Sequence, residues 1–291
     1  MGRFFLGVLR AGFLPPSLRV PYALAVKRLW LRFSSNSCVV RIANVGLISL
    51  SPWEFIDSRL FFFGIWEPSV TSFIAGAIRP ASTVLDIGAH IGYYSLLMSR
   101  LVGSSGHVYS FEPTPQTREK LNKNLQLNCI ENTVVCPFGV SDRTEFREFE
   151  VDRGGNAGTN RFGALSGTGL ELRRISEVVR EEHLRQTSLI KIDVEGMELI
   201  VLRDILAILP MLRADVTICA ELRSSPDLRA LLERYKEAGF ELYALENVYR
   251  MRRYASSKRC DPTQIEVLPD GQHDVALIRR PGRGATTLSP P

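Results

Sequence analysis

The stretch TVLDIGAHIGYYS, residues 83–95, constrains the fold of this chain more than any other. Its first part, 83–87, is β-branched and aliphatic, which predicts a strand that ends at Gly88. From Ile91 to Leu101 the apolar residues recur at helical spacing, which predicts a helix directly after a tight glycine turn. The first N–H groups of such a helix lack backbone partners. The motif therefore predicts a binding site for a negatively charged or electron-rich ligand group.

Short apolar strands alternate with amphipathic helices along the rest of the chain. That pattern is typical of a parallel sheet covered by helices on both faces. Two helices are marked by their ends, since 116–128 follows Pro115 and 226–238 stops at Gly239. The strands that we predict are 83–87, 107–112, 133–140, 188–193, 215–221, 240–245 and 274–279. The expected fold class is therefore α/β, with a seven-strand, doubly wound, mostly parallel sheet.

Composition divides the chain into three parts. Residues 1–79 form a basic N-terminal extension, with seven basic residues and no acidic one before Glu54. We expect the extension to pack on the core, although its Arg-rich composition also fits a transit peptide or a peripheral contact with a membrane surface. Residues 80–280 form the main domain, and 281–291, rich in Gly and Pro, are expected to be a disordered tail.

The connection between the third predicted strand and Leu189 is unusually long, at roughly 48 residues. It contains TEFREFEVD, which predicts an added strand, then a segment with six glycines, then a helix near 174–184. A glycine-rich segment above a binding edge would serve as a lid. A surface insertion explains the same composition equally well.

Composition also limits the class of protein. With 45% hydrophobic residues and no apolar run near the ~20 residues that cross a bilayer, we expect a globular protein without a transmembrane segment. The five cysteines form no CxxC pair and their number is odd, which argues against a disulfide framework. Cys136 and Cys219 lie in apolar runs and are expected to be buried thiols in a reducing compartment, the cytoplasm.

Acidic residues stand at or just after the ends of five predicted strands. They are Asp86, Glu112, Asp142, Asp193 and Glu221. In an open parallel sheet such ends share one edge, and ligands bind at that edge. A row of acids there would repel a pyrophosphate and attract a ligand that carries positive charge.

The glycine turn does not fit a dinucleotide. The dinucleotide fingerprint needs three glycines, and its positions are occupied here by Gly88, His90 and Tyr93. A dehydrogenase is therefore the least favoured class of enzyme. Glu112, in contrast, ends the second predicted strand, where an acidic side chain accepts hydrogen bonds from ribose hydroxyls. The ligand so described has a ribose, a cationic centre and a small anionic group, and S-adenosylmethionine has all three.

Five strings in this order resemble the FkbM family of S-adenosylmethionine-dependent methyltransferases. Within residues 53–245 they are FFFGIWEP, VLDIGAHIGYYS, VYSFEP, GVSD and LIKIDVEGMELIVL. The resemblance implies a Rossmann-like class I methyltransferase fold and an enzyme that methylates a hydroxyl on a secondary metabolite or a glycan. The family typically carries Asn at the position of His90.

The sheet edge and the resemblance together assign the cofactor residues. The turn expected to hold the methionine part of the cofactor consists of Asp86, Gly88, Ala89, His90 and Gly92. Glu112 is expected to hold the ribose and Asp142 to contact adenine. Glu67, in the WEP string, matches a family position and is expected to close the cofactor pocket.

Methyl transfer to oxygen requires an in-line approach to the methyl group and a base near the acceptor oxygen. The string KIDVEGMELIVL, which resemblance to the family places beside the acceptor, supplies Asp193 and Glu195. Asp193 is the favoured base or acceptor-orienting group, and Glu195 is the second choice. Glu198 is expected to complement the positive end of the following helix, an effect of about 0.3–1 kcal/mol. Asp193, Glu195 and Glu221 could instead hold a divalent ion, but no spacing is diagnostic and we predict no metal site.

Two other functions remain open. The segment NVYRMRRYASSKR, 247–259, interleaves basic and aromatic residues and could bind an acidic acceptor or single-stranded nucleic acid. Against a nucleic-acid methyltransferase, the chain lacks an NPPY-like string and a PC dipeptide. The other alternative is a non-catalytic module that keeps the fold for binding alone.

Overall fold

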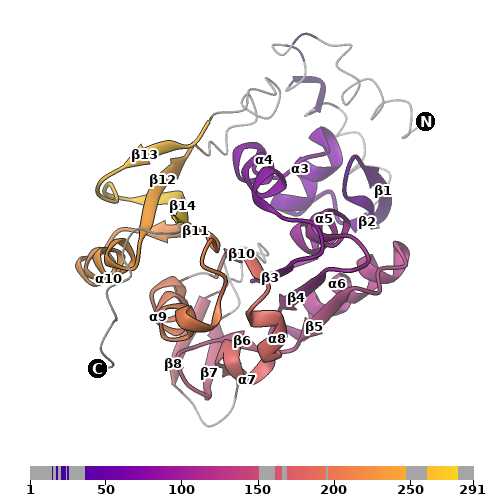
Figure 1. Ribbon diagram of the computed structural model, residues 1–291. Helices are drawn as coiled ribbons and strands as arrows, with labels where there is room; N and C mark the ends of the chain where they lie inside the picture. Colours follow the sequence, from indigo (N-terminus) through magenta and orange to yellow (C-terminus); the bar gives the residue numbers. More distant parts are fainter. Residues whose placement is uncertain are drawn as a thin grey trace.

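A large sheet lies at the centre of the molecule in the computed structural model, with helices on both of its faces (Figure 1). The structure describes residues 15, 18, 21–23, 25, 37–150, 161–165, 169–194, 196–246 and 261–280, apart from the side chains of 149–150 and 161–165.

The central sheet has eight strands in the order β13-β12-β14-β11-β10-β3-β4-β5. Their bounds are β3 Thr83–Ile87, β4 His107–Phe111, β5 Thr133–Cys136, β10 Thr187–Ile192, β11 Thr217–Arg223, β12 Phe240–Leu245, β13 Thr263–Ile265 and β14 Gln272–Arg279. The strands β3, β4, β5, β10 and β11 run parallel, and β14 is antiparallel to both β11 and β12. The short β13 pairs antiparallel with the outer edge of β12. The predicted doubly wound, mostly parallel sheet is confirmed, with one strand more than the seven expected.

The prediction of a single strand over 133–140 is wrong at its end. The strand β5 stops at Cys136, and after Pro137 the chain enters a second sheet as β6 Gly139–Val140. Proline lacks the N–H that the ladder needs, which accounts for the break. The second sheet has the order β6-β9-β7-β8, with β7 Glu145–Glu150, β8 Arg161–Leu165 and β9 Leu170–Arg173. The strand β7 confirms the added strand predicted for TEFREFEVD.

The helix predicted near 174–184 is instead two short helices, α7 Ile175–Val178 and α8 Glu181–Leu184. They are separated where Val179 adopts an extended backbone, with ψ at 130°. Much of the glycine-rich segment before them lies outside the described residues, and its role as a lid stays a prediction.

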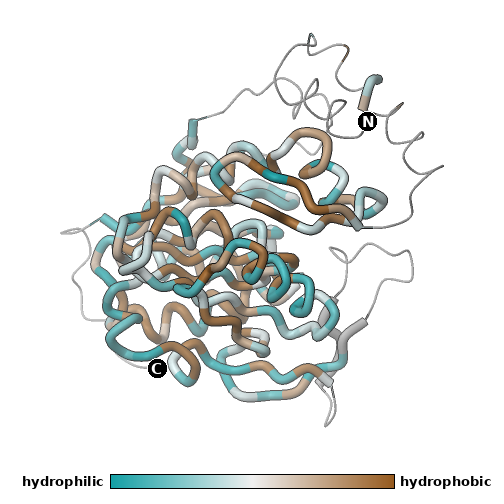
Figure 2. The backbone as a smooth tube through the Cα atoms, turned by 90° about the vertical axis from the view of Figure 1, so that its right-hand side faces the viewer, coloured by the Kyte–Doolittle hydropathy of each residue, from teal (hydrophilic) through white to brown (hydrophobic). Residues whose placement is uncertain are grey.

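The longer helices form one layer on each face of the central sheet. One face carries α3 Phe55–Phe63, α4 Pro68–Ala77, α5 Tyr93–Val102 and α6 Pro115–Leu127, and the other carries α9 Glu198–Ile208, its 3-10 continuation Leu209–Met211 and α10 Pro226–Glu237. Successive residues of a strand face opposite layers, so that Val84 packs with the first set and Leu85 with the second. Both faces are therefore apolar, and Figure 2 shows the apolar positions gathered in the interior.

An N-terminal hairpin packs on the same apolar layer as α5 and α6. Its strands are β1 Cys38–Ile42 and β2 Gly46–Leu50. Ile42 and Ile48 are buried in one apolar cluster with Val84 of the central sheet. The hairpin therefore contributes to the core that supports β3.

Within the described residues, no single helix is long and apolar enough to cross a membrane, and α3 and α4, bent by 75°, reach that length and apolarity only as a pair. Cys136 and Cys219 are buried thiols, as expected. A cytoplasmic location stays a prediction.

The side chain of Asn124 ties the hairpin to the glycine turn, which yields a prediction about stability. Its Oδ1 accepts from the Ser49 N–H and its Nδ2 donates to the Ile91 carbonyl, both at 2.8 Å, and the side chain is fully buried. Replacing Asn124 by Ala should lower the free energy of unfolding by about 2 kcal/mol, because two buried backbone groups lose their partner. Urea unfolding checks this, with Asn122→Ala, an exposed position on the same helix, as the matched control. Equal free energies of unfolding of the two variants would contradict the role of Asn124 in tying the hairpin to the turn.

Candidate active site

The turn between β3 and α5 is fastened to the end of β4. The N–H groups of Gly88 and Ala89 both donate to the Phe111 carbonyl, each at 3.0 Å. The next N–H, that of His90, donates to Glu112 Oε2 at 3.0 Å. Three successive residues of the turn are therefore positioned by the strand that carries the predicted ribose acid.

The same turn lies directly against the end of β10. Gly88 has a φ of +85°, and a Cβ added to it would lie 1.9 Å from the Asp193 carbonyl oxygen. Gly92, which caps α5, has a φ of +91°. Only glycine combines this conformation with such close contact. Because the Asp193 N–H also donates to the Ile87 carbonyl at 2.9 Å, the ends of β3, β4 and β10 meet at one point.

The Glu112 carboxylate is held in place at both of its oxygens and keeps lone-pair capacity for a further donor. The side chain is 6% exposed, Oε2 accepts from His90, and Oε1 accepts from the Thr114 N–H at 2.9 Å. Burial raises the pKa of its carboxyl, although the N–H groups of Thr114 and His90 oppose the shift. A carboxylate has about four lone-pair sites. The Thr114 side chain also hydrogen-bonds to this carboxylate, which leaves about one lone-pair site for a further donor.

Asp86 is the one acid buried within β3, a strand in which every residue is buried. Its Oδ2 accepts from Ser95 Oγ at 2.6 Å, and Ser95 Oγ in turn accepts from Ser110 Oγ at 2.8 Å. Its Oδ1 has no hydrogen-bond partner among the described residues and lies 4.0 Å from Lys191 Nζ. Burial raises the pKa of Asp86 and the Lys191 ammonium lowers it, with burial the larger effect.

His90 adopts a left-handed backbone conformation in the turn. Its φ of +49° is a left-handed conformation that both Asn and His adopt more readily than most residues. Its Nε2 is shielded from solvent and has no partner in the part of the chain that the structure describes. Burial lowers the pKa of the imidazole to about 4, so the ring is neutral at neutral pH.

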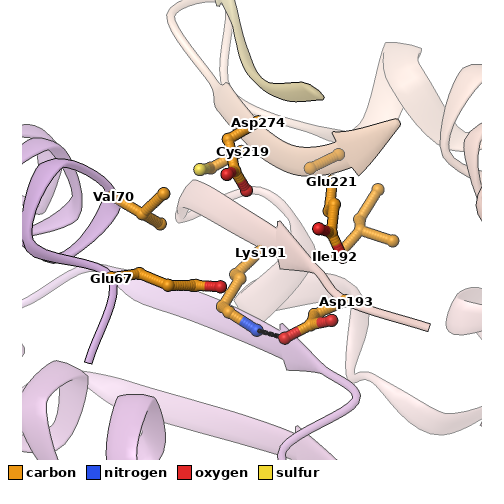
Figure 3. A pocket seen from close by; sticks show the side chains of 9 residues that line it. Glu67, Val70, Lys191, Ile192, Asp193, Cys219, Glu221 and Asp274 are labelled. Carbon is orange, nitrogen blue, oxygen red and sulfur yellow. Dashed lines mark hydrogen bonds and ion pairs between the residues drawn. The ribbon is translucent and has the colours of Figure 1, made fainter. Parts of the chain in front are cut away.

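A pocket opens beside this turn, between α4 and the ends of β10, β11 and β14 (Figure 3). It is lined by Glu67, Val70, Lys191, Ile192, Asp193, Cys219, Ala220, Glu221 and Asp274. Asp193, the predicted base, therefore faces a pocket while its backbone contacts the glycine turn.

Lys191 is the cation of this pocket. Its ammonium donates to Asp193 Oδ2 at 3.0 Å and lies 4.6 Å from the centre of the Tyr94 ring. Burial lowers the pKa of Lys191, but the carboxylates of Asp193 and Asp86 outweigh it and raise the pKa above its ordinary value. The side chain is therefore a permanent positive charge that is only 3% exposed.

Glu67 enters the pocket from the N-terminal end of α4. It has a φ of +42°, is 5% exposed, and its Oε2 accepts from the Tyr94 hydroxyl at 2.8 Å. In Figure 3 its carboxylate points toward Lys191. The structure thus brings Glu67 to the side of Asp193, and its predicted role in closing the cofactor pocket stays a prediction.

For two further predicted site residues, the expected roles stay predictions. Asp142 follows β6, which belongs to the second sheet, and its charge acts on Asp204 and Arg143. Its contact with adenine stays a prediction. Glu195, the second candidate base, lies outside the described residues.

Two charged pocket residues, Lys191 and Asp274, and Tyr94 beside them were not anticipated. Lys191 carried a signal, since a single charge inside the buried run LIKID demands a partner. Asp274 is brought opposite Glu221 by the antiparallel register of β14, and Tyr94 reaches Glu67 through the packing of α4 on α5. Neither contact has a local signal in the sequence. In the described part of the chain, no three His, Cys, Asp or Glu side chains are arranged to hold a metal ion.

A doubly wound sheet with a glycine turn after its first central strand and a buried acid after its second is a Rossmann-like arrangement. Residues 86–267 match the Methyltransferase FkbM domain, so the chain belongs to the FkbM methyltransferase family. The matched model is that of a methyltransferase domain. The close-packed glycine turn and the buried carboxylate of Glu112 fit S-adenosylmethionine as the cofactor.

The chain is also similar to individual methyltransferases. Methyltransferase sdnD of Sordaria araneosa is 28% identical over 42% of this chain and 60% of its own length. Hexuronic acid methyltransferase AglP of Haloferax volcanii is 25% identical over 40% of this chain and 47% of its own. The chain thus spans about half the length of these relatives. The crystal structure of methyltransferase FkbM from Methylobacillus flagellatus has a TM-score of 0.45 and 16% identity, covering 75% of this chain and 50% of that one.

The contact at Gly88 predicts a selective loss of cofactor binding. In Gly88→Ala the added Cβ must displace the Asp193 backbone, so affinity for S-adenosylmethionine should fall by at least about tenfold. Isothermal titration calorimetry measures it. The matched control is Gly76→Ala in α4, where a Cβ meets nothing within 4 Å and should stabilise the helix by about 0.5–1 kcal/mol. Unchanged affinity in Gly88→Ala would separate the turn from the cofactor site.

The buried imidazole predicts a pH dependence of stability. Unfolded His takes up a proton near pH 6.5, whereas His90 in the folded protein does so only near pH 4. The unfolded state therefore binds the extra proton first, and stability falls as the pH drops through this window. Relative to His90→Asn, the wild type should lose about 2 kcal/mol between about pH 7.5 and about pH 5 in urea unfolding. Identical pH dependence of the two proteins would show that the imidazole is not held neutral.

Proposed function

We propose that this chain transfers the methyl group of S-adenosylmethionine to a hydroxyl of a small-molecule or glycan acceptor. The observation that carries the proposal is that Asp193 contacts both the glycine turn and the adjoining pocket. Its backbone packs against Gly88 of the cofactor turn, while its carboxylate lines the adjoining pocket. A base at the border of the two sites is what O-methylation needs.

The residues of the two sites have separate tasks. S-adenosylmethionine supplies an activated methyl group when bound. Glu112 accepts the ribose hydroxyls, and the turn at Gly88 holds the methionine part against the sheet. Asp193 takes the proton of the acceptor hydroxyl, with Glu195 as the second candidate. The approach of the two reactants is set by the rigid strand ends rather than by a loop.

The class of acceptor is supported by the pocket and by one relative. The name of AglP states that this relative acts on a hexuronic acid, a sugar derivative rich in hydroxyl groups. The pocket here is lined by several carboxylates around one lysine, which suits a polar, hydroxyl-bearing molecule. The basic segment 247–259, which suggested a nucleic-acid substrate, lies outside the described residues. The pocket lining and this relative support methylation of a small polar acceptor.

The proposal predicts that one variant loses affinity for S-adenosylmethionine and that another loses only turnover. Glu112→Ala should lose affinity for S-adenosylmethionine, because the ribose loses its acceptor. Asp193→Asn should keep that affinity and lose about 10²–10⁴-fold in turnover, because Asn cannot take a proton. Binding is measured by calorimetry, and turnover by release of S-adenosylhomocysteine with a panel of hexuronic acids, hexoses and phenols. The matched control Asp227→Asn, exposed at the start of α10, should match the wild type in both assays.

Three results would contradict the proposal. Binding of NAD in place of S-adenosylmethionine would overturn the cofactor assignment. Cofactor binding without turnover of any hydroxyl acceptor would favour the non-catalytic module. Methylation of an acceptor at unchanged rate by Asp193→Asn would remove Asp193 as the base.

A further inference from the structure

The position of Lys191 in the sheet calls for an explanation. It is the last but one residue of β10, all of whose residues are buried, and it is 3% exposed. Burying a charge is costly unless it is paired. A buried ion pair by itself is weak support for stability, since apolar residues of similar volume often do as well.

Neutralising Asp86 does not account for the orientation of the lysine. Lys191 and Asp86 are partners in the register of β10 and β3, and Asp86 is the more deeply buried acid. Yet Nζ lies 4.0 Å from Asp86 Oδ1 and makes its hydrogen bond, at 3.0 Å, to Asp193 Oδ2. Asp86 Oδ1 has no hydrogen bond within the described residues. The ammonium is thus drawn away from the core and toward the edge where the pocket opens.

The ammonium has donors left over at that edge. An ammonium carries three N–H donors. Among the described residues its one hydrogen-bond partner is Asp193, and the Tyr94 ring lies 4.6 Å away. Figure 3 shows Nζ between the carboxylates of Glu67 and Asp193, within the pocket lining. A further hydrogen bond is therefore available to an atom that enters the pocket beside Asp193.

Lys191 is unsuited to the role of base. The carboxylates of Asp193 and Asp86 keep its pKa above the ordinary value of a lysine despite burial. A group that keeps its proton donates hydrogen bonds and stabilises negative charge.

We infer that Lys191 is a catalytic residue whose ammonium donates a hydrogen bond to the acceptor oxygen while Asp193 removes the acceptor proton. The O–H bond breaks, its proton passes to the Asp193 carboxylate, and an oxygen lone pair forms the new bond to the methyl carbon. The electron pair of the broken C–S bond remains on sulfur, and Lys191 keeps all its protons. The inference rests on the proposed function and adds to it a second group that acts on the acceptor.

This position predicts a charge effect that can be measured without an acceptor. A cation beside the acceptor oxygen also lies close to the reacting methyl group, and so disfavours cationic S-adenosylmethionine relative to neutral S-adenosylhomocysteine. Replacing Lys191 by Met or by Gln should shift the ratio of the two affinities toward S-adenosylmethionine by at least about fivefold. Lys191→Arg, which keeps the charge, should leave the ratio near that of the wild type, as should Lys123→Met at an exposed position of α6.

The outcomes distinguish the inference from the function on which it rests. Calorimetry with both ligands is done on the full chain, with circular dichroism to confirm that each variant is folded. An unchanged ratio, or an equal loss of both affinities in folded Met and Gln variants, would overturn the inference and leave Lys191 as a structural ion pair. Failure of the wild type to bind either ligand would instead remove the proposed function. With an acceptor from the hydroxyl panel, turnover should be lost in Lys191→Met and partly restored in Lys191→Arg.

Discussion

The contact of Gly88 with the Asp193 carbonyl is the constraint on which the site depends. Neighbouring parallel strands end at the same edge of a sheet and lie about 4.8 Å apart. A turn that leaves one strand can pass directly against the end of the next only where no side chain stands between them. Here the absence of a Cβ lets the turn lie against β10, and the N–H groups of Gly88 and Ala89 secure it to the Phe111 carbonyl of β4. Cofactor turn, ribose acid and candidate base thereby become parts of one rigid unit. In the proposed reaction this unit holds the cofactor and the acceptor in a fixed relation.

A second organising element is a row of three charged side chains that extends from the core to the pocket. Asp86 lies in β3, Lys191 lies opposite it in β10, and Asp193 directly follows β10. Lys191 forms ion pairs with both acids. In a site of low dielectric such charges act more strongly than in water. The hydroxyl groups of Ser95 and Ser110 anchor the inner end of this group of charges, and the outer end faces the pocket. In the proposed reaction the arrangement places a proton acceptor, Asp193, and a hydrogen-bond donor, Lys191, side by side at the pocket.

Much of this was available in the sequence. Several predicted strands are aliphatic runs with an acid at or just after their end. In a parallel sheet these ends share one edge, which brings Asp86, Glu112 and Asp193 together. What the sequence did not reveal depends on contacts between distant segments. Pro137 diverts the chain so that Asp142 follows a strand of another sheet, and the register of β14 brings Asp274 opposite Glu221. The place of Glu67 depends on how α4 packs against α5, which no local pattern encodes. Lys191 is the exception, because a lone buried charge is visible in the sequence even where its partner is not.

A crystal structure of the complex with S-adenosylhomocysteine tests the central claim most directly. The account predicts that the ribose hydroxyls contact the Glu112 carboxylate, that the methionine part lies on the turn at Gly88, and that the sulfur faces the pocket of Lys191 and Asp193. A ligand bound with its sulfur away from that pocket, or with its ribose on another acid, would contradict it.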